Sequence, residues 1–416
     1  MTSTKEIGVN GARLWDSLME MARIGATTAG GCNRQALTDE DKAGRDLFIR
    51  WAKAEGCAVS IDKMGNLFAR REGLDPSLPA VIAGSHLDTQ PTGGKFDGVY
   101  GVLAGLEVIR TLNENDVKTQ HPIDVVVWTN EEGARFSPAM IGSGVFAGAF
   151  DIDYGHSRCS KDGESIADEL QRIDYAGDRT CEPYPIKAAF EVHIEQGPIL
   201  ERNKKTIGVV QGVQGIKWLD VVFAGDAVHA GPTPMTMRRD PMIAVSGTMQ
   251  QMYAYISSVD ADARVTFGDI NASPGVRNTV PETVTLAVDI RHPDANTLAD
   301  INARLVAIVA EQAEAADVVG DIREEWFSPA LKFDKDCIAA VKVATEALGA
   351  SYQPIVSGAG HDSVYVARVA PTSMIFVPCE GGVSHNESEN AEPADLTAGA
   401  NVLLGAMLQM ANKVEA

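Results

Sequence analysis

The sequence lacks any run of about 20 apolar residues, the length that a transmembrane helix needs. Its N-terminus, M-T-S-T-K-E-I-G-V-N, also lacks the apolar centre of a secretory signal. The six cysteines include no C-x-x-C pair, so nothing indicates a zinc ribbon or a redox dithiol. These absences predict a cytoplasmic protein with reduced thiols and no membrane partner.

Positive charge is scarce as well. The chain has 36 lysines and arginines against 57 aspartates and glutamates, a formal net charge of -21 at pH 7. This charge would repel phosphate backbones, so we expect no nucleic-acid partner. The nucleotide motifs G-x-G-x-x-G and G-x-x-x-x-G-K-[ST] and the serine-nucleophile motif G-x-S-x-G are also absent.

The pattern of apolar residues changes twice along the 416 residues, which are many for one compact core. Residues 1–212 contain helices, a hairpin and buried-type strands at 79–85 and 123–130. Residues 213–327 follow the order β-α-β-β-α-β, which predicts a small antiparallel sheet with two helices on one face. Residues 328–416 resume the helix-strand alternation. We therefore predict an α/β fold in which the first and last segments form one discontinuous catalytic domain, a mixed sheet flanked by helices, with a smaller α+β domain inserted.

Side chains of metal-binding type follow or lie within the strand-like runs of the catalytic segments. In chain order they are His86, Asp97, Glu132, His193 and His385. In open α/β sheets the ligand crevice lies at the carboxyl ends of the strands. Imidazoles and carboxylates without a thiolate suit zinc, with manganese, cobalt or nickel as substitutes. Because a carboxylate has two oxygens, Asp97 could bridge two cations, and the set predicts a two-metal hydrolase with an activated water.

Acidic neighbours of these ligands indicate further roles. Asp88, in G-S-H-L-D, could accept a hydrogen bond from the imidazole nitrogen of His86 that faces away from a metal. Glu131 adjoins Glu132, and two such carboxylates repel each other unless a cation is near, so we expect one ligand and one proton acceptor. Each motif alone is also compatible with a structural His-Asp pair or a solvated acidic turn. The acidic run N-E-S-E-N-A-E after His385 is interpreted as a solvated loop.

Other residues are typical of a substrate pocket. His229 lies in the stiff segment H-A-G-P-T-P-M, and Asn278 precedes a predicted strand that ends at Arg291. Arg291 could bind a carboxylate through two parallel hydrogen bonds. The glycines around His361 in S-G-A-G-H-D-S would let backbone amides face a small ligand. The alternatives are a surface histidine for His229 and a salt bridge with a neighbour for Arg291.

With these motifs the chain resembles the hydantoinase/carbamoylase family of zinc amidohydrolases over roughly residues 11–410. The motifs G-S-H-L-D-T, G-x-F-D-G-x-Y-G-V, N-E-E-G-x-R-F, H-I-E-Q-G-P, H-A-G-P-T-P-M, R-x-D and S-G-A-G-H-D stand in the family's order. The resemblance implies that Asp97 bridges two zinc ions. One ion would be completed by His86 and His193, and the other by Glu132 and His385.

The resemblance also implies functions for residues around the metals. Glu131 would be the general base, and the peptide bond after Asp97 would be cis. Substrate contacts are implied for Gln196, Asn278, Arg291, Gly360 and His361. The inserted domain would serve as a lid and for dimerisation, with His229 reaching into the active site of the other subunit of a homodimer.

These residues predict an enzyme that hydrolyses the ureido C–N bond of an N-carbamoyl-L-amino acid or N-carbamoyl-β-alanine to the amino acid, ammonia and carbon dioxide. Its partner would be a small carboxylate substrate with a ureido group. The closest alternative is allantoate amidohydrolase. A di-zinc aminopeptidase or N-acyl amino acid deacylase fits less well, because those relatives usually have an acidic residue at the position of His193. A non-catalytic binding protein on the same scaffold is the alternative from another class, and the intact Glu131 argues against it.

Overall fold

The computed structural model describes residues 7–413. The chain forms two compact units. One contains the chain up to Gly212 and from Phe333 onward, and the other runs from Val213 to Lys332. The first unit therefore combines two segments that lie far apart in the sequence.

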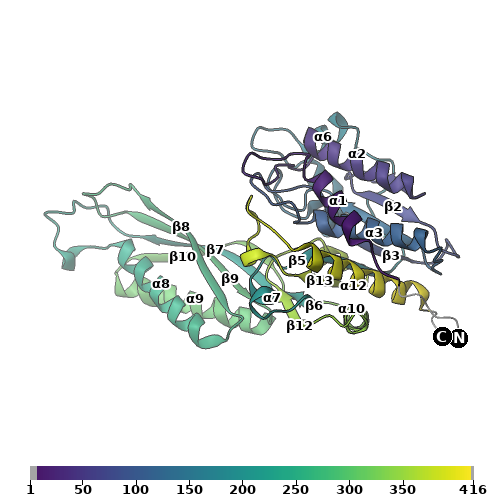
Figure 1. The fold of residues 1–416 in the computed structure, drawn as a ribbon. Coiled ribbons are helices and arrows are strands. Elements are labelled where there is room, and N and C mark those ends of the chain that lie inside the picture. The colour runs from purple at the N-terminus through teal and green to yellow at the C-terminus, as the bar shows by residue number, and fades with distance from the viewer. Residues whose placement is uncertain (1–6, 414–416) are drawn as a thin grey trace. The chain divides into compact units, whose positions relative to one another are not determined.

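The first unit is built on a mixed sheet, as predicted (Figure 1). Its strands are β1 (Ala58–Ile61), β2 (Leu67–Arg71), β3 (Ala80–His86), β4 (Ile123–Trp128), β5 (Ile186–Ile194), β6 (Ile207–Val213), β12 (Tyr352–Ser357) and β13 (Thr372–Val377). The order is β1-β2-β4-β3-β5-β13-β6-β11, where β11 is the two-residue strand Leu331–Lys332, and β12 also pairs with β6. The four central strands β4, β3, β5 and β13 are parallel, and the pairs on either side of them are antiparallel. Every residue of β3 and β4 is buried, which explains their continuous apolar runs.

Helices cover this sheet. The longer ones are α1 (Gly11–Met21), α2 (Asp39–Ala54), α3 (Val99–Glu114), α10 (Lys335–Ala347) and α12 (Pro393–Asn412). Short helices are α4 (Ile141–Phe146), α5 (Ile152–His156), α6 (Ile166–Arg172), α7 (Ile199–Arg202), α11 (Ser363–Val366) and the 3-10 turn η2 (Glu380–Gly382). Helices α3 and α12 pack against β3 and β5, and α1 packs on both helices. No helix within the described residues is long and apolar enough to span a membrane.

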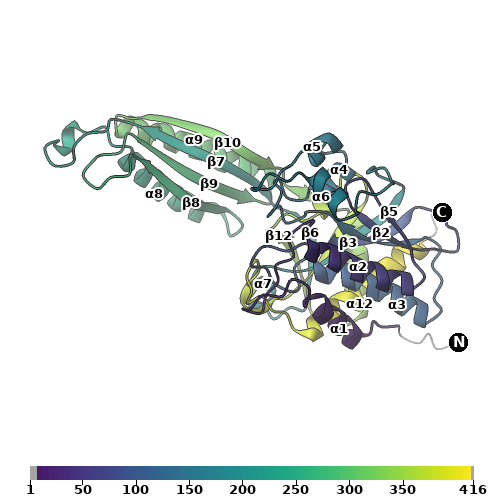
Figure 2. The same ribbon diagram turned by 90° about the horizontal axis from the view of Figure 1, so that it is seen from above.

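The second unit has the predicted β-α-β-β-α-β order. Its elements are β7 (Gly215–Ala224), η1 (Met235–Met237), α8 (Pro241–Val259), β8 (Arg264–Ser273), β9 (Thr283–His292), α9 (Ala295–Ala315) and β10 (Val319–Ser328), followed by the two-residue β11 (Leu331–Lys332). The antiparallel sheet has the order β10-β7-β9-β8, and α8 and α9 cover one of its faces (Figure 2). In β9 buried and half-buried residues alternate, because one face of the strand packs against these helices.

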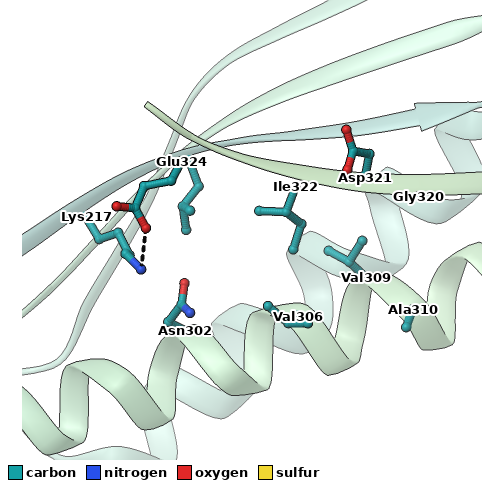
Figure 3. A pocket seen from close by; sticks show the side chains of 10 residues that line it. Lys217, Asn302, Val306, Val309, Ala310, Gly320, Asp321, Ile322 and Glu324 are labelled. Atoms are coloured by element: carbon teal, nitrogen blue, oxygen red, sulfur yellow. Dashed lines mark ion pairs between the residues drawn. The ribbon is translucent and has the colours of Figure 1, made fainter. Parts of the chain in front are cut away.

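A groove of about 430 Å³ lies between α9 and β10 of this unit (Figure 3). Val306, Val309 and Ile322 supply apolar lining. The ammonium of Lys217 pairs with the carboxylate of Glu324 at 2.7 Å along the same groove. None of the predicted site residues lines it.

Candidate metal centre

The five predicted metal ligands come from the carboxyl ends of adjacent strands and from the loops that follow them. His86 is the last residue of β3, and His193 is the next-to-last residue of β5. Glu132 follows β4, Asp97 precedes α3, and His385 follows β13. Because β4, β3, β5 and β13 are parallel neighbours, their carboxyl ends meet at one edge of the sheet. The topology thus brings all five residues together within the first unit.

A first group of candidate ligands is buried. The Nε2 atoms of His86 and His193 lie 3.6 and 3.2 Å from Oδ1 of Asp97. The Nδ1 atoms of these histidines lie 2.9 Å from the backbone carbonyl oxygens of Asp88 and Ile194, respectively. A carbonyl oxygen only accepts, so each Nδ1 carries a proton. Both Nε2 atoms face Asp97, and that of His193 also accepts the backbone N–H of Gly98 at 3.0 Å. The three side chains could therefore hold one cation through two nitrogens and one oxygen.

A second group shares Asp97 with the first. Nε2 of His385 lies 3.4 Å from Oδ2 of Asp97 and 3.4 Å from Oε2 of Glu132. The two oxygens of Asp97 thus face different imidazoles, Oδ1 toward the buried pair and Oδ2 toward His385. His385 differs from the buried histidines, because its side chain is 54% exposed and its backbone has a φ of 53°. This group could hold a second cation.

The charge of the cluster suits cations. The carboxylates of Asp97, Glu131 and Glu132 are nearly excluded from solvent, and each has an oxygen 3.2 to 3.6 Å from an imidazole nitrogen. Burial raises the pKa of Glu131 well above its usual range, His86 opposes this shift, and the carboxylates of Asp362 and Glu132 add to it. Burial also raises the pKa of Glu132, and Asp97 adds to that shift. Concentrated buried negative charge is costly unless cations compensate it, so the donor set fits divalent metals.

Asp88 acts differently from the prediction. Its backbone carbonyl, rather than its carboxylate, accepts the hydrogen bond from Nδ1 of His86, and its Oδ1 lies 3.9 Å from that nitrogen. The carboxylate instead accepts the backbone N–H groups of Glu131 at 3.4 Å and Glu132 at 3.2 Å. These N–H groups follow the end of β4 and are buried, so a carboxylate acceptor satisfies them. Asp88 therefore orients the segment that carries both glutamates.

The prediction of a cis peptide bond after Asp97 is wrong. The cis bonds in the described residues are Ser137–Pro138 and Ser273–Pro274. Gly98 instead takes a φ of 66°, and a Cβ atom there would overlap the imidazole of His86. Glycine is required at this position because the backbone turns directly against a candidate ligand.

Three residues with predicted substrate contacts lie beside this cluster. Nε2 of Gln196 donates to Oδ2 of Asp97 at 2.8 Å, and its Oε1 is buried with no hydrogen-bond partner in the described part of the chain. His361 is buried, and its ring centroid lies 4.6 Å from that of His193. Gly360 leaves little room for a side chain, since a Cβ atom there would lie 3.0 Å from the terminal methyl of Met140. The free Oε1 of Gln196 could accept a hydrogen bond from a ligand.

The other predicted substrate residues belong to the second unit. His229 and Asn278 are exposed. They lie close together, because the backbone carbonyl of Asn278 accepts the backbone N–H of Ala230, the residue after His229, at 2.9 Å. Arg291 is half-buried on β9, where its Nε and Nη2 donate to the carboxylate of Asp289 at 2.9 and 2.7 Å. This is the neighbouring salt bridge that the sequence left open as an alternative. A substrate carboxylate at Arg291 would have to share or replace Asp289.

Two side chains that hold candidate ligands were not predicted. Gln90 donates its backbone N–H to Oε1 of Glu132 at 3.1 Å and its side-chain amide to Oε2 at 2.7 Å. In the sequence, the feature that could have indicated Gln90 is its position directly after the motif H-L-D-T. Glu389 is 3% exposed, so the interpretation of the acidic run after His385 as a solvated loop is wrong at this residue. Nothing in the sequence separates Glu389 from Glu387 in the same run.

A third group of metal-binding residue types, Glu191, His193 and His361, also lies within reach of one cation. The carboxylate of Glu191 already accepts the hydroxyls of Ser85 at 2.7 Å and Ser363 at 2.6 Å. The Nε2 of His193 faces Asp97, as described above. Glu191 therefore serves as a hydrogen-bond acceptor that joins β3, β5 and α11.

A mixed sheet whose parallel strands present imidazoles and carboxylates at one edge, in a chain with a separate four-stranded α+β unit, is the architecture of a metal-dependent hydrolase. The chain belongs to the peptidase family M20/M25/M40, whose family model matches residues 82–409.

Three similar proteins have names that state an activity or a family. The chain is 47% identical to an N-carbamoyl-L-amino-acid amidohydrolase of Rhizobium meliloti, over 98% of each chain. It is 32% identical to the allantoate amidohydrolase of Escherichia coli (strain K12), over 95% of this chain and 97% of the relative. The crystal structure of an amidase of the hydantoinase/carbamoylase family from Burkholderia multivorans matches with a TM-score of 0.95 and 52% identity, over 98% of this chain and 100% of that one. The family resemblance predicted from the motifs is confirmed, and the amidohydrolase names agree with the predicted class of enzyme.

Proposed function

We propose that this protein hydrolyses the ureido C–N bond of N-carbamoyl-L-amino acids to the amino acid, ammonia and carbon dioxide. The observation that carries the proposal is the position of Asp97, whose two oxygens face separate groups of candidate metal ligands beside Glu131. The 47% identity with an N-carbamoyl-L-amino-acid amidohydrolase over nearly the whole chain supports this substrate class.

The proposed cofactor is a pair of divalent cations, with zinc as the native metal and manganese, cobalt or nickel as substitutes. His86 and His193 would hold one cation, Glu132 and His385 the other, and Asp97 would bridge them. When bound, such a pair polarises a carbonyl oxygen and lowers the pKa of a bound water. The Nδ1–H groups of His86 and His193 donate to backbone carbonyls, which leaves the Nε2 atom of each ring as the nitrogen that would bind a cation.

Glu131 is the proposed general base. Its Oε2 lies 3.6 Å from Nε2 of His86, a member of the first ligand group. The carboxylate would take a proton from water at this oxygen and later deliver it to the departing nitrogen. Its backbone N–H donates to the carboxylate of Asp88, which holds the backbone of residue 131 directly after β4.

The remaining predicted site residues would bind the carboxylate and the ureido group of the substrate. We assign the carboxylate to Arg291, helped by Asn278 and Gln196, and contacts at the reacting end to Gly360 and His361. The second unit, predicted as residues 213–327, would act as a lid and dimerisation domain. In the proposed homodimer, His229 of the partner subunit stabilises the charge that develops on the carbonyl oxygen.

The test is ammonia release from a substrate panel containing several N-carbamoyl-L-amino acids, their D-enantiomers, N-carbamoyl-β-alanine and allantoate. The proposal requires turnover of at least one N-carbamoyl-L-amino acid that stops after chelation and returns with added metal. Turnover of allantoate alone would favour the second candidate, which the 32% identical Escherichia coli relative supports. Ligand binding without ammonia release from any compound would instead indicate the non-catalytic binding protein.

A further inference from the structure

Glu389 is a buried carboxylate inside an acidic surface run, and its surroundings are shaped around it. Its exposed fraction is 3%, whereas Asn386 and Ser388 in the same run are exposed. Gly94 lies directly against it, because a Cβ atom at Gly94 would overlap the Glu389 carboxyl group. Burying a carboxylate is costly unless hydrogen bonds compensate, so these contacts need a reason.

Both oxygens of Glu389 are used. Oε1 accepts the backbone N–H groups of Phe96 at 3.0 Å and Asp97 at 3.2 Å, although Asp97 lies 292 positions away in the sequence. Oε2 accepts the hydroxyl of Ser384 at 2.8 Å. Glu389 therefore ties the backbone of the candidate bridging aspartate to the residue that precedes His385.

Ser384 completes the link from the other side. Its hydroxyl oxygen also lies 3.0 Å from Oδ2 of Asp97, the oxygen that faces His385. A hydroxyl has one proton, so Ser384 donates either to Glu389 or to Asp97. A cation on Oδ2 of Asp97 favours donation to Glu389, because the hydroxyl proton would otherwise compete with the cation for that oxygen.

The two candidate cation groups differ in how much they depend on this link. His86 and His193 are buried on strands, and the hydrogen bonds of Glu389 in the described structure go to Phe96, Asp97 and Ser384 instead. His385 lies on a loop, is 54% exposed and has a φ of 53°, a conformation that non-glycine residues adopt only when their surroundings hold them. Support for His385 therefore has to come from its neighbours in the loop, of which Ser384 is the first.

We propose that Glu389 is a positioning residue that holds Asp97 and the Ser384-His385 segment together and thereby maintains the second cation position, formed by Asp97, Glu132 and His385. The inference rests on the proposed two-metal function. It assigns to Glu389 no contact with substrate. Supporting hydrogen bonds of this kind commonly change metal affinity by about 10–100-fold when removed.

The experiment is a titration of the metal-free full-length protein with cobalt. Binding is measured by calorimetry and by the visible spectrum of bound cobalt. The wild type should bind two cations per chain. Glu389→Gln should keep the first and weaken the second by about 10–100-fold. The physical reason is that the glutamine amide donates to Ser384, whose hydroxyl then has only Oδ2 of Asp97 to donate to.

Asp62→Asn is the matched control. Asp62 is also a buried carboxylate that accepts two backbone N–H groups, from Met64 and Asn66 at 2.9 Å each, and one side-chain donor, the amide of Asn66 at 2.9 Å. It touches none of the candidate ligands, so this variant should bind both cations as the wild type does. General destabilisation by loss of a buried carboxylate would affect both variants alike.

Ser384→Ala keeps the proposal testable if Glu389→Gln does not fold. It removes only the hydroxyl link and should also weaken the second cation while the first stays bound. The inference is overturned if a folded Glu389 variant, or Ser384→Ala, binds both cations with wild-type affinity, or if both cations weaken equally. A wild-type protein that binds fewer than two cations would instead overturn the proposed function itself, and with it this inference.

Discussion

Replacing Glu131 by glutamine separates proton transfer from metal binding. Glutamine has the same shape as glutamate but accepts no proton at neutral pH. The backbone of residue 131 would stay in place, because its N–H donates to Asp88 at 3.4 Å and its carbonyl accepts the N–H of Met140 at 2.8 Å. The candidate ligands are untouched by the change. We therefore expect Glu131→Gln to fold and to bind metal as the wild type does.

The magnitude follows from the function assigned to Glu131. General acid-base catalysis contributes about 10²–10⁴-fold in rate. That factor corresponds to about 3–5 kcal/mol in the activation free energy. In Glu131→Gln, kcat for the best N-carbamoyl-L-amino acid should fall by this factor, and KM should change much less.

The assay measures ammonia release, with metal content by elemental analysis on the same preparation. Glu132→Gln is the contrasting variant, because Glu132 belongs to the second cation group and its neutral form should reduce metal content as well as rate. A Glu131→Gln enzyme with near wild-type kcat would refute the assignment of the base. Loss of metal equal to that of Glu132→Gln would show that residue 131 acts as a ligand instead.

Three further predictions concern the metals, the substrate carboxylate and the backbone turn at the site. Dialysis against a chelator should abolish ammonia release, and zinc, manganese or cobalt should restore it; full activity in metal-free protein would contradict the two-metal centre. Arg291→Ala should lower kcat/KM for carboxylate substrates by tenfold or more, since removing a charged partner costs about 1.5–3 kcal/mol; an unchanged value would place the carboxylate elsewhere. Gly98→Ala should displace the imidazole of His86 and lower metal content, as measured by elemental analysis, whereas Gly148→Ala, at a positive-φ glycine with open space around it, should not.

Much of the fold could be predicted because local patterns were strong. The apolar runs at 79–85 and 123–130 became β3 and β4, and the β-α-β-β-α-β order of the second unit was correct. The short helices α4 to α7 were not predicted. They have four to seven residues each, too few for a periodic apolar face to be recognised.

The sequence by itself determined which kinds of ligand are present and that they follow strands, because residue type and apolar runs are local properties. It also determined the family, since the motifs stand in one order along the chain. Only the tertiary structure decided that the two oxygens of Asp97 face different imidazoles, that the Asp88 carboxylate accepts backbone N–H groups rather than the His86 imidazole, and that Glu389 is buried. Each of these depends on which backbone groups, distant in the sequence, come within hydrogen-bond reach, and a linear pattern carries no information about that.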